Sequence, residues 1–133
     1  FLQERGLVHD AMQCYQTAIK LRPDFAIAYG NLASCYYDCG CQDLAIKTFR
    51  YAIQLEPNFP DAYNNLGNAL RESGQLEVRG HGVCFPLVSL ANHRENIFDL
   101  NIVGAAINCY RTTLRLKPDH PHAYNNLGNA MKD

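Results

Sequence analysis

A pattern that repeats at a fixed spacing is the feature that most restricts how this chain folds. Tyr29 and Tyr63 are 34 positions apart, and so are Pro23 and Pro57. The same spacing relates six further pairs: Leu32 and Leu66, Gly40 and Gly74, Ala11 and Ala45, Tyr15 and Phe49, Ala18 and Ala52, Leu21 and Leu55. Self-similarity at a fixed period of roughly 20–50 residues is typical of solenoids, in which each repeat packs against its neighbours.

The period is interrupted once. The residues that correspond to Pro57 and Tyr63 in the next repeat are Pro118 and Tyr124, and both lie 61 positions further along the chain. Because 61 exceeds 34 by 27, a block of that length has been inserted into one repeat. It covers residues 78–104 and falls where the two halves of that repeat would meet.

Each repeat is predicted to contain two helices. Apolar residues recur with helical spacing over 62–70, and Gly74 is expected to end that first helix. The same pattern covers 45–53, with Asp43 as the expected N-cap and Pro57 beyond the end. Small residues recur where the paired helices would cross closely, with aromatic residues opposite: Ala33, Gly67, Gly128, Ala45 and Ala106.

These segments carry a resemblance. AYGNLASCYYDCG (28–40), LAIKTFRYAIQLEP (44–57) and AYNNLGNALRESG (62–74) resemble the tetratricopeptide repeat (TPR), with tyrosine at the usual tryptophan position of the first helix. The resemblance implies an all-α, right-handed solenoid of antiparallel helix pairs with one irregular inserted loop. The expected units are as follows: the second helix of a truncated repeat (1–25), a complete repeat (26–59), a repeat split by the insertion (60–77 and 105–120), the insertion (78–104), and the first helix of a truncated repeat (121–133). We therefore expect a fragment of a longer protein.

A narrower resemblance rests on AYGNLASCYY, FPDAYNNLGNAL, AAINCYR and HPHAYNNLGNA. These runs are similar to the repeat arm of protein O-GlcNAc transferases, most of all the plant SECRET AGENT type. The resemblance implies a nuclear and cytoplasmic parent that transfers GlcNAc from UDP-GlcNAc to Ser or Thr. In such a parent, this chain would recruit protein substrates and would carry neither a catalytic residue nor a cofactor. The repeat arm would also allow the protein to form a homo-oligomer. Similar asparagine-rich repeats occur in SPINDLY-type fucosyltransferases, and a non-enzymatic scaffold or adapter is the alternative function. A glycosyltransferase module after Asp133 would favour the transferase.

Asparagine is the informative polar residue. Asn31, Asn65 and Asn126 each lie two positions after the tyrosine of a repeat, between residues that point into the stack. They should therefore face the concave groove and form a ladder. A carboxamide offers a donor and an acceptor together, so a row of them can hold the backbone of an extended peptide. The resemblance to O-GlcNAc transferases implies the same role at these three positions. A solvated helix face or local stabilising hydrogen bonds are the alternatives. Weaker candidates lie nearby: Asn64, Asn68, Asn125 and Asn129.

Other site types find little support. Adapters that hold a terminal carboxylate need Lys or Arg two before, one after or two after the repeat tyrosine, and none of these positions holds either residue. The cysteines at 35, 39 and 41 lack a paired CxxC spacing, so no metal site and reduced thiols are predicted. His120 and His122 flank Pro121 and are expected to face solvent. Charged residues such as Arg71, Glu72, Arg111 and Arg115 are expected on solvated faces.

The overall composition excludes two partner classes. A net charge of −1 gives no electrostatic basis for binding nucleic acid. The longest mostly apolar run, residues 83–91, is far shorter than the ~20 residues that span a bilayer, so no membrane partner is expected.

The insertion has two interpretations. It is either a binding loop or lid, or a translated intron. We expect that the block is a translated intron. It is a whole number of codons, and it begins with valine, whose codons begin with GT as a splice donor does. Genomic sequence without GT and AG at its edges would exclude that origin.

Overall fold

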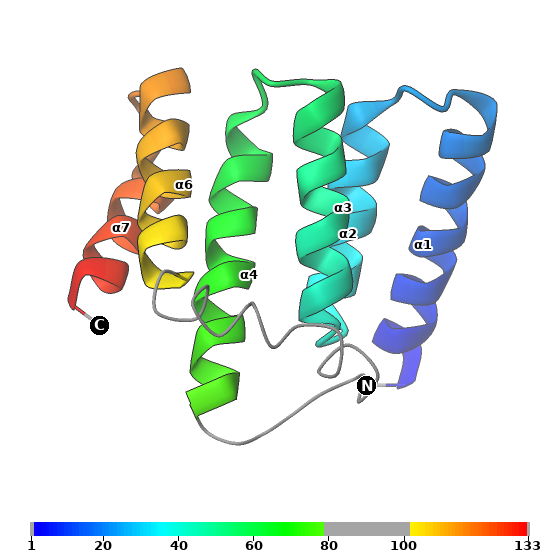
Figure 1. The fold of residues 1–133 in the computed structure, drawn as a ribbon. Coiled ribbons are helices and arrows are strands. Elements are labelled where there is room, and N and C mark those ends of the chain that lie inside the picture. The colour runs from blue at the N-terminus through cyan, green and yellow to red at the C-terminus, as the bar shows by residue number, and fades with distance from the viewer. Residues whose placement is uncertain (1, 79–101, 133) are drawn as a thin grey trace, which may run out of the picture.

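The computed structural model describes residues 2–78 and 102–132, and within these ranges the regular secondary structure is entirely helical (Figure 1). The helices are α1 (Leu2–Leu21), α2 (Ala26–Asp38), α3 (Gln42–Leu55), α4 (Pro60–Val78), α6 (Ile102–Leu116) and α7 (Pro121–Lys132). They stand side by side in chain order, and successive helices run in opposite directions. The predicted all-α solenoid of antiparallel helix pairs is confirmed.

Two helix pairs form the body of the stack. α2 packs extensively on α3, and α4 packs extensively on α6, although residues 79–101 lie between α4 and α6 in the sequence. The contacts between successive pairs, α3 with α4 and α6 with α7, are less extensive. At the two ends, α1 packs on α2 and α7 packs mainly on α6.

The core lies where small residues let the paired helices approach closely. Ala33, Ala45 and Ala106 are completely buried, and Phe49 and Tyr110 fill the space beside them. The tightest approach is in the α4–α6 pair, where a Cβ atom on Gly67 would lie 2.7 Å from Cε1 of Tyr110. The expected pairing of small and aromatic residues is confirmed in the pairs α2–α3 and α4–α6, where it brings the backbones together, but not at Gly128, where a Cβ atom would meet nothing within 4 Å.

The two glycines expected to end first helices behave differently. Gly40 has φ +82° just after the end of α2, in the left-handed conformation that glycine adopts freely. Gly74 does not end α4, which continues to Val78. It lies against the start of α6, where a Cβ atom on Gly74 would be 3.1 Å from Cγ2 of Ile102. The prediction was wrong because no short turn follows Gly74, and a glycine alone costs a helix only about 1 kcal/mol relative to alanine.

Other details at helix starts also differ from expectation. Cys41, not Asp43, is the N-cap of α3, and it makes no side-chain capping hydrogen bond. Asp43 instead lies in the first turn, where a carboxylate interacts favourably with the helix dipole. At the predicted insertion, residue 78 belongs to α4 and residues 102–104 belong to α6. The remaining positions, 79–101, include His81, Cys84 and His93 and lie outside the described residues.

Arg71 and Glu72 do not form a solvated face, contrary to the sequence prediction. Both side chains are half-buried. The carboxylate of Glu72 accepts a hydrogen bond from the Tyr37 hydroxyl and another from Nε2 of Gln42 at 3.0 Å. The neighbouring helix pair explains the error, because α2 and α3 supply donors that helical periodicity within α4 does not reveal.

Candidate functional site

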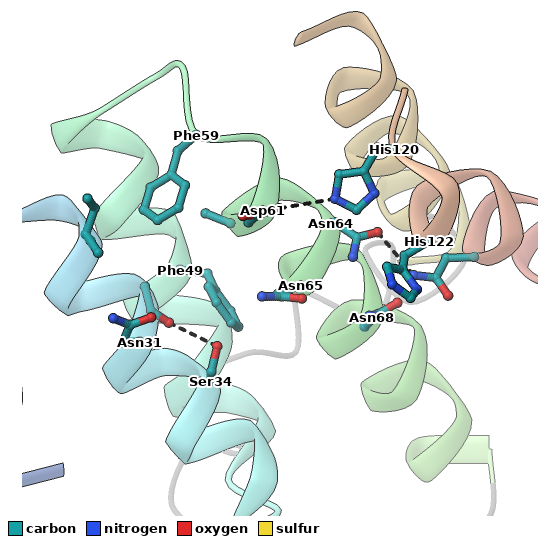
Figure 2. A pocket seen from close by; sticks show the side chains of 14 residues that line it. Asn31, Ser34, Phe49, Phe59, Asp61, Asn64, Asn65, Asn68, His120 and His122 are labelled. Atoms are coloured by element: carbon teal, nitrogen blue, oxygen red, sulfur yellow. Dashed lines mark hydrogen bonds and ion pairs between the residues drawn. The ribbon is translucent and has the colours of Figure 1, made fainter. Parts of the chain in front are cut away.

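A groove of about 680 Å³ runs along the first helices of three successive repeats (Figure 2). It is formed by α2, α4 and α7, with Phe49 of α3 at its base and the turns before α4 and α7 at its edge. The lining residues are Ile27, Gly30, Asn31, Ser34, Phe49, Phe59, Asp61, Ala62, Asn64, Asn65, Asn68, His120, His122 and Asn126. Five asparagines from three helices thus share one cavity.

Asn31 and Asn65 occupy corresponding positions on α2 and α4 and both line the groove (Figure 2). The side chain of Asn31 is exposed and that of Asn65 is half-buried. Neither carboxamide makes a hydrogen bond with any residue in the described parts of the chain. Their donors and acceptors are therefore available to a ligand in the groove.

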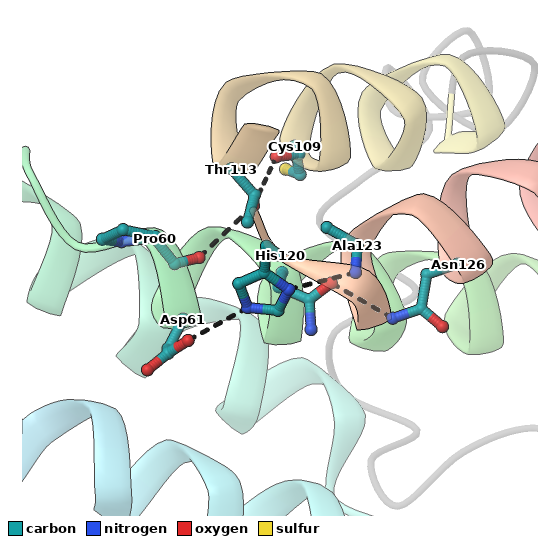
Figure 3. Close-up of polar contacts among 8 residues, drawn as sticks. Pro60, Asp61, Cys109, Thr113, His120, Ala123 and Asn126 are labelled. Atoms are coloured by element: carbon teal, nitrogen blue, oxygen red, sulfur yellow. Dashed lines mark hydrogen bonds and ion pairs between the residues drawn. The ribbon is translucent and has the colours of Figure 1, made fainter. Parts of the chain in front are cut away.

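Asn126, the third member of the predicted ladder, is bonded within the protein. Its Nδ2 donates to Oδ1 of Asn64 at 3.1 Å, which joins α7 to α4 (Figure 3). Asn64 itself is only 6% exposed. Asn126 therefore lines the groove and also makes a stabilising hydrogen bond between repeats, the two alternatives that the sequence left open for this residue. Oδ1 of Asn126 and the second N–H of its Nδ2 remain for a ligand.

The other asparagine candidates divide into two groups. Asn68 lines the groove, but its Oδ1 accepts a hydrogen bond from the hydroxyl of Tyr110 at 2.7 Å and thereby holds the aromatic ring in the core. Asn125 and Asn129 are not among the residues that line the groove. Asn125 is exposed on α7, whereas its counterpart Asn64 on α4 is covered by α7 and accepts the hydrogen bond from Asn126; no further first helix lies over Asn125 in the described residues.

His120 is a groove residue that sequence reasoning placed in solvent. Its side chain is buried, with 7% of the residue exposed. Nδ1 accepts the backbone N–H of Ala123 at 3.1 Å and so caps the start of α7, while Nε2 lies 3.1 Å from Oδ1 of Asp61 (Figure 3). Because Nδ1 acts as an acceptor, the neutral ring carries its proton on Nε2 and donates it to the carboxylate.

The repeat register contains a signal for His120. The offset of 61 positions across the interrupted repeat places His120 in correspondence with Phe59. The ring of Phe59 lies so close to Gly30 that a Cβ atom there would be 2.9 Å from it. The residue that corresponds to Gly30 in the next repeat is Asn64. The groove is therefore apolar where α4 meets α2, since Phe59 lies over Gly30. It is polar where α7 meets α4, since His120 lies near Asp61 and Asn64.

Few charges lie in the groove. Asp61 is the one formally charged residue among those that line it, and His122 lies beside His120, with ring centroids 6.2 Å apart. In the described ranges 2–78 and 102–132, no group of three His, Cys, Asp or Glu side chains is arranged to hold a metal ion. No helix described here combines the length and apolar character needed to cross a membrane.

Comparisons with known proteins agree with the architecture. The family model described as TPR repeat matches residues 4–40, 33–74 and 98–133. No curated protein matches the sequence significantly. Among solved structures, the first TPR of Spaghetti (RPAP3), bound to an HSP90 peptide, has a TM-score of 0.70 at 20% identity and covers 97% of this chain and 81% of that one.

Two further structures extend this comparison. The second TPR domain of human RPAP3, in complex with an HSP70 peptide, has a TM-score of 0.67 at 21% identity over 98% of this chain and 86% of that chain. An O-GlcNAc transferase mutant of Thermobaculum terrenum has a TM-score of 0.71 at 25% identity over 97% of this chain but only 20% of that chain. The likeness to the RPAP3 domains shows the fold alone.

The family matches cover most of the chain and leave residues 1–3 and 75–97 outside them. The first match spans α1 and α2, the second runs from the end of α2 through α3 and most of α4, and the third spans α6 and α7. The chain belongs to the tetratricopeptide-repeat family.

Proposed function

We propose that this chain binds extended protein segments in the groove between α2, α4 and α7, as the substrate-recruiting arm of a UDP-GlcNAc-dependent protein O-GlcNAc transferase in the nucleus and cytoplasm. The observation that carries the proposal is the line of equivalent carboxamides, Asn31, Asn65 and Asn126, along one groove. An amide side chain matches the N–H and C=O of a peptide unit, so recognition would depend on the backbone of the ligand.

The availability of these amides supports the groove as a peptide site. The side chains of Asn31 and Asn65 make no hydrogen bond in the described parts of the chain, and the side chain of Asn126 keeps its carbonyl oxygen for a ligand. The lining includes Phe59 and Ile27, which offer apolar surface beside the polar row. A ligand held mainly through its backbone can vary in sequence, as an enzyme with many protein substrates requires.

The comparisons support the two parts of the proposal unequally. Two structures of the same fold hold chaperone peptides, which favours a peptide ligand for the groove. The O-GlcNAc transferase of Thermobaculum terrenum supports the transferase assignment, at 25% identity over a fifth of its length. The non-enzymatic adapter is the alternative, and both functions use the same groove.

The double variant Asn31→Ala/Asn65→Ala tests backbone recognition. We expect it to weaken binding of a fluorescein-labelled, uncharged peptide rich in Ser and Thr by roughly tenfold or more, since each lost hydrogen bond contributes about 0.5–1.5 kcal/mol. Fluorescence anisotropy measures the affinity, and circular dichroism should show unchanged helix content. N-methylation of alternate peptide amides should weaken binding to the unmodified chain by a similar factor.

Asn125→Ala and Asn108→Ala are the matched controls, because both side chains are exposed and neither lines the groove. They should bind the peptide as the unmodified chain does. If the double variant also keeps full affinity, the asparagine row does not hold peptides and the proposal fails.

The transferase assignment needs the complete coding sequence. Cloning the full transcript that contains these residues and assaying transfer from radiolabelled UDP-GlcNAc to Ser/Thr-containing proteins tests it directly. We expect transfer activity that is lost when the downstream module is removed. A transcript that encodes further repeats and then stops, with no transfer, would leave the adapter function instead.

A further inference from the structure

The groove crosses two junctions, α2–α4 and α4–α7, where the first helix of one repeat meets the first helix of the next. In the repeat register, Ile27 corresponds to Asp61, and Phe59 corresponds to His120. Asp61 and His120 meet at the α4–α7 junction, where Nε2 of the histidine lies 3.1 Å from Oδ1 of the carboxylate. The same two positions at the α2–α4 junction hold the apolar side chains of Ile27 and Phe59, and both line the groove.

Gly30 adds a second difference between the junctions. Its counterpart in the next repeat is Asn64, whose Oδ1 accepts the hydrogen bond from Asn126. The counterpart of Asn126 is Asn65, which finds no such acceptor at position 30, so its carboxamide stays available to a ligand. The missing side chain also makes room for Phe59, because a Cβ atom on Gly30 would lie 2.9 Å from Cζ of the ring. One glycine thus admits an apolar ring and leaves a carboxamide available.

The apolar surface at the α2–α4 junction lies beside the two available carboxamides. Ile27 is 56% exposed, and Asn31 follows it by one helical turn on α2. Phe59, Asn31 and Asn65 lie at one end of the groove, whereas His120 and His122 lie at the other (Figure 2). Successive side chains of an extended peptide point to opposite sides. A segment held through its backbone by the two carboxamides can therefore turn one side chain toward Ile27 and Phe59.

The α2–α4 junction belongs to the interior of the stack. α2 packs on α1 and α3, and α4 packs on α3 and α6, so both helices of this junction have neighbours on either side. The exposure of Ile27 is consequently a property of the groove between two packed repeats.

The α4–α7 junction is unsuited to an apolar side chain. The side chain of Asp61 is 74% exposed there, although Oδ1 contacts His120. His122 is also exposed and lines the same part of the groove. An apolar side chain at this place would remove water from a carboxylate without replacing its hydrogen bonds, which is unfavourable.

We propose that Ile27 and Phe59 form an apolar subsite, which takes one aliphatic side chain of an uncharged, extended protein segment held by Asn31 and Asn65. The preferred ligand carries a single aliphatic residue among polar ones, because the next junction along the groove presents polar side chains. This inference rests on the proposed function, since it needs a ligand whose backbone follows the carboxamides. It adds a side-chain preference to backbone recognition.

Two fluorescein-labelled, uncharged Ser/Thr peptides that differ only at one central residue, leucine or asparagine, test the subsite by fluorescence anisotropy. Leucine and asparagine are similar in size, so the comparison isolates apolar character. We expect the unmodified chain to bind the leucine peptide roughly tenfold more tightly, since burying a leucine side chain is worth a few kcal/mol at most.

Ile27→Ser removes most of the exposed apolar surface of the subsite. In this variant the preference for the leucine peptide should fall to about twofold or less. Leu44→Ser is the matched control, because Leu44 is a 39% exposed aliphatic residue that does not line the groove. It should keep the tenfold preference, and circular dichroism should show the same helix content for both variants and the unmodified chain.

Nuclear Overhauser effects locate the leucine side chain directly. With a peptide labelled at the leucine methyl groups, we expect contacts to the ring protons of Phe59 and none to the ring of His120. Equal affinity of the unmodified chain for the two peptides would overturn the subsite and leave backbone recognition standing. A leucine preference that survives Ile27→Ser would place the side chain elsewhere and also overturn it. If neither peptide binds, the subsite and the proposed function both fail.

Discussion

Alanine at Gly67 is expected to destabilise the chain, whereas alanine at the corresponding position, Gly128, is expected to stabilise it. A Cβ atom on Gly67 would lie 2.7 Å from Cε1 and 2.9 Å from Cζ of Tyr110. The ring cannot move aside easily, because it is completely buried and its hydroxyl is bonded to Asn68. At Gly128 the same methyl group meets no atom within 4 Å.

The pair of variants separates steric overlap from helix propensity. Alanine is favoured over glycine in a helix by up to about 1 kcal/mol, and both variants share this gain. Overpacking costs about 1–3 kcal/mol and acts only at Gly67. The free energies of unfolding from urea titrations should therefore differ by about 1–3 kcal/mol, with Gly128→Ala the more stable.

The double variant Gly67→Ala/Tyr110→Leu checks the cause of this difference. A leucine side chain does not place ring atoms against residue 67, so the penalty for Gly67→Ala should largely disappear in this background. Equal stabilities for the two single variants would mean that the close approach of α4 and α6 is not a limiting contact.

The helix pairs and part of the groove could be predicted because both follow from the period alone. A spacing of 34 positions places Asn31 and Asn65 on corresponding faces of successive first helices, and the structure puts both in one cavity. This inference needs only the helical period and the stacking of neighbours. The position of Asn126 in the same cavity follows once the inserted block is subtracted.

Features that depend on contacts between repeats could not be predicted in this way. The burial of His120 follows from the proximity of Asp61, 59 positions earlier in the chain, and from its cap on α7. Glu72 is half-buried because Tyr37 and Gln42 approach it from the preceding repeat. The repeat register places His120 at the position of Phe59, but each of these polar contacts is specific to one pair of helices, so the register does not reveal the partner residues.

Raising the pH above about 9 is expected to unfold the chain progressively, because three acids packed between helices of the stack are held in their neutral forms. Burial raises the pKa of Tyr110 from 10.0 to about 12, and burial raises the pKa of Cys109 from 9.0 to about 11. Burial, together with the hydrogen bond to Glu72, also raises the pKa of Tyr37 well above its ordinary value. All three lie at contacts between helices of the core.

The direction of the effect follows from proton linkage. An acid whose pKa is higher in the folded state loses its proton more readily in the unfolded state, so deprotonation at high pH favours unfolding. The stabilisation is complete below the unfolded pKa values, 9.0 for Cys109 and 10.0 for the tyrosines, and is lost as pH rises toward the folded values. For Tyr110 alone, the rise in pKa from 10.0 to about 12 corresponds to roughly 3 kcal/mol near pH 12.

Urea titrations followed by circular dichroism between about pH 7 and pH 11.5 would measure this loss. Tyr110→Phe should cost about 1 kcal/mol at neutral pH, since it removes the hydrogen bond to Asn68, but its stability should fall less steeply above about pH 10. Tyr124→Phe, which removes a hydroxyl from a 58% exposed residue, is the matched control. The proposal fails if the unfolding free energies of Tyr110→Phe, Tyr124→Phe and the unmodified chain fall in parallel as the pH rises. In that case the hydroxyl of Tyr110 does not hold α6 against α4, and ionisation of other groups drives the transition.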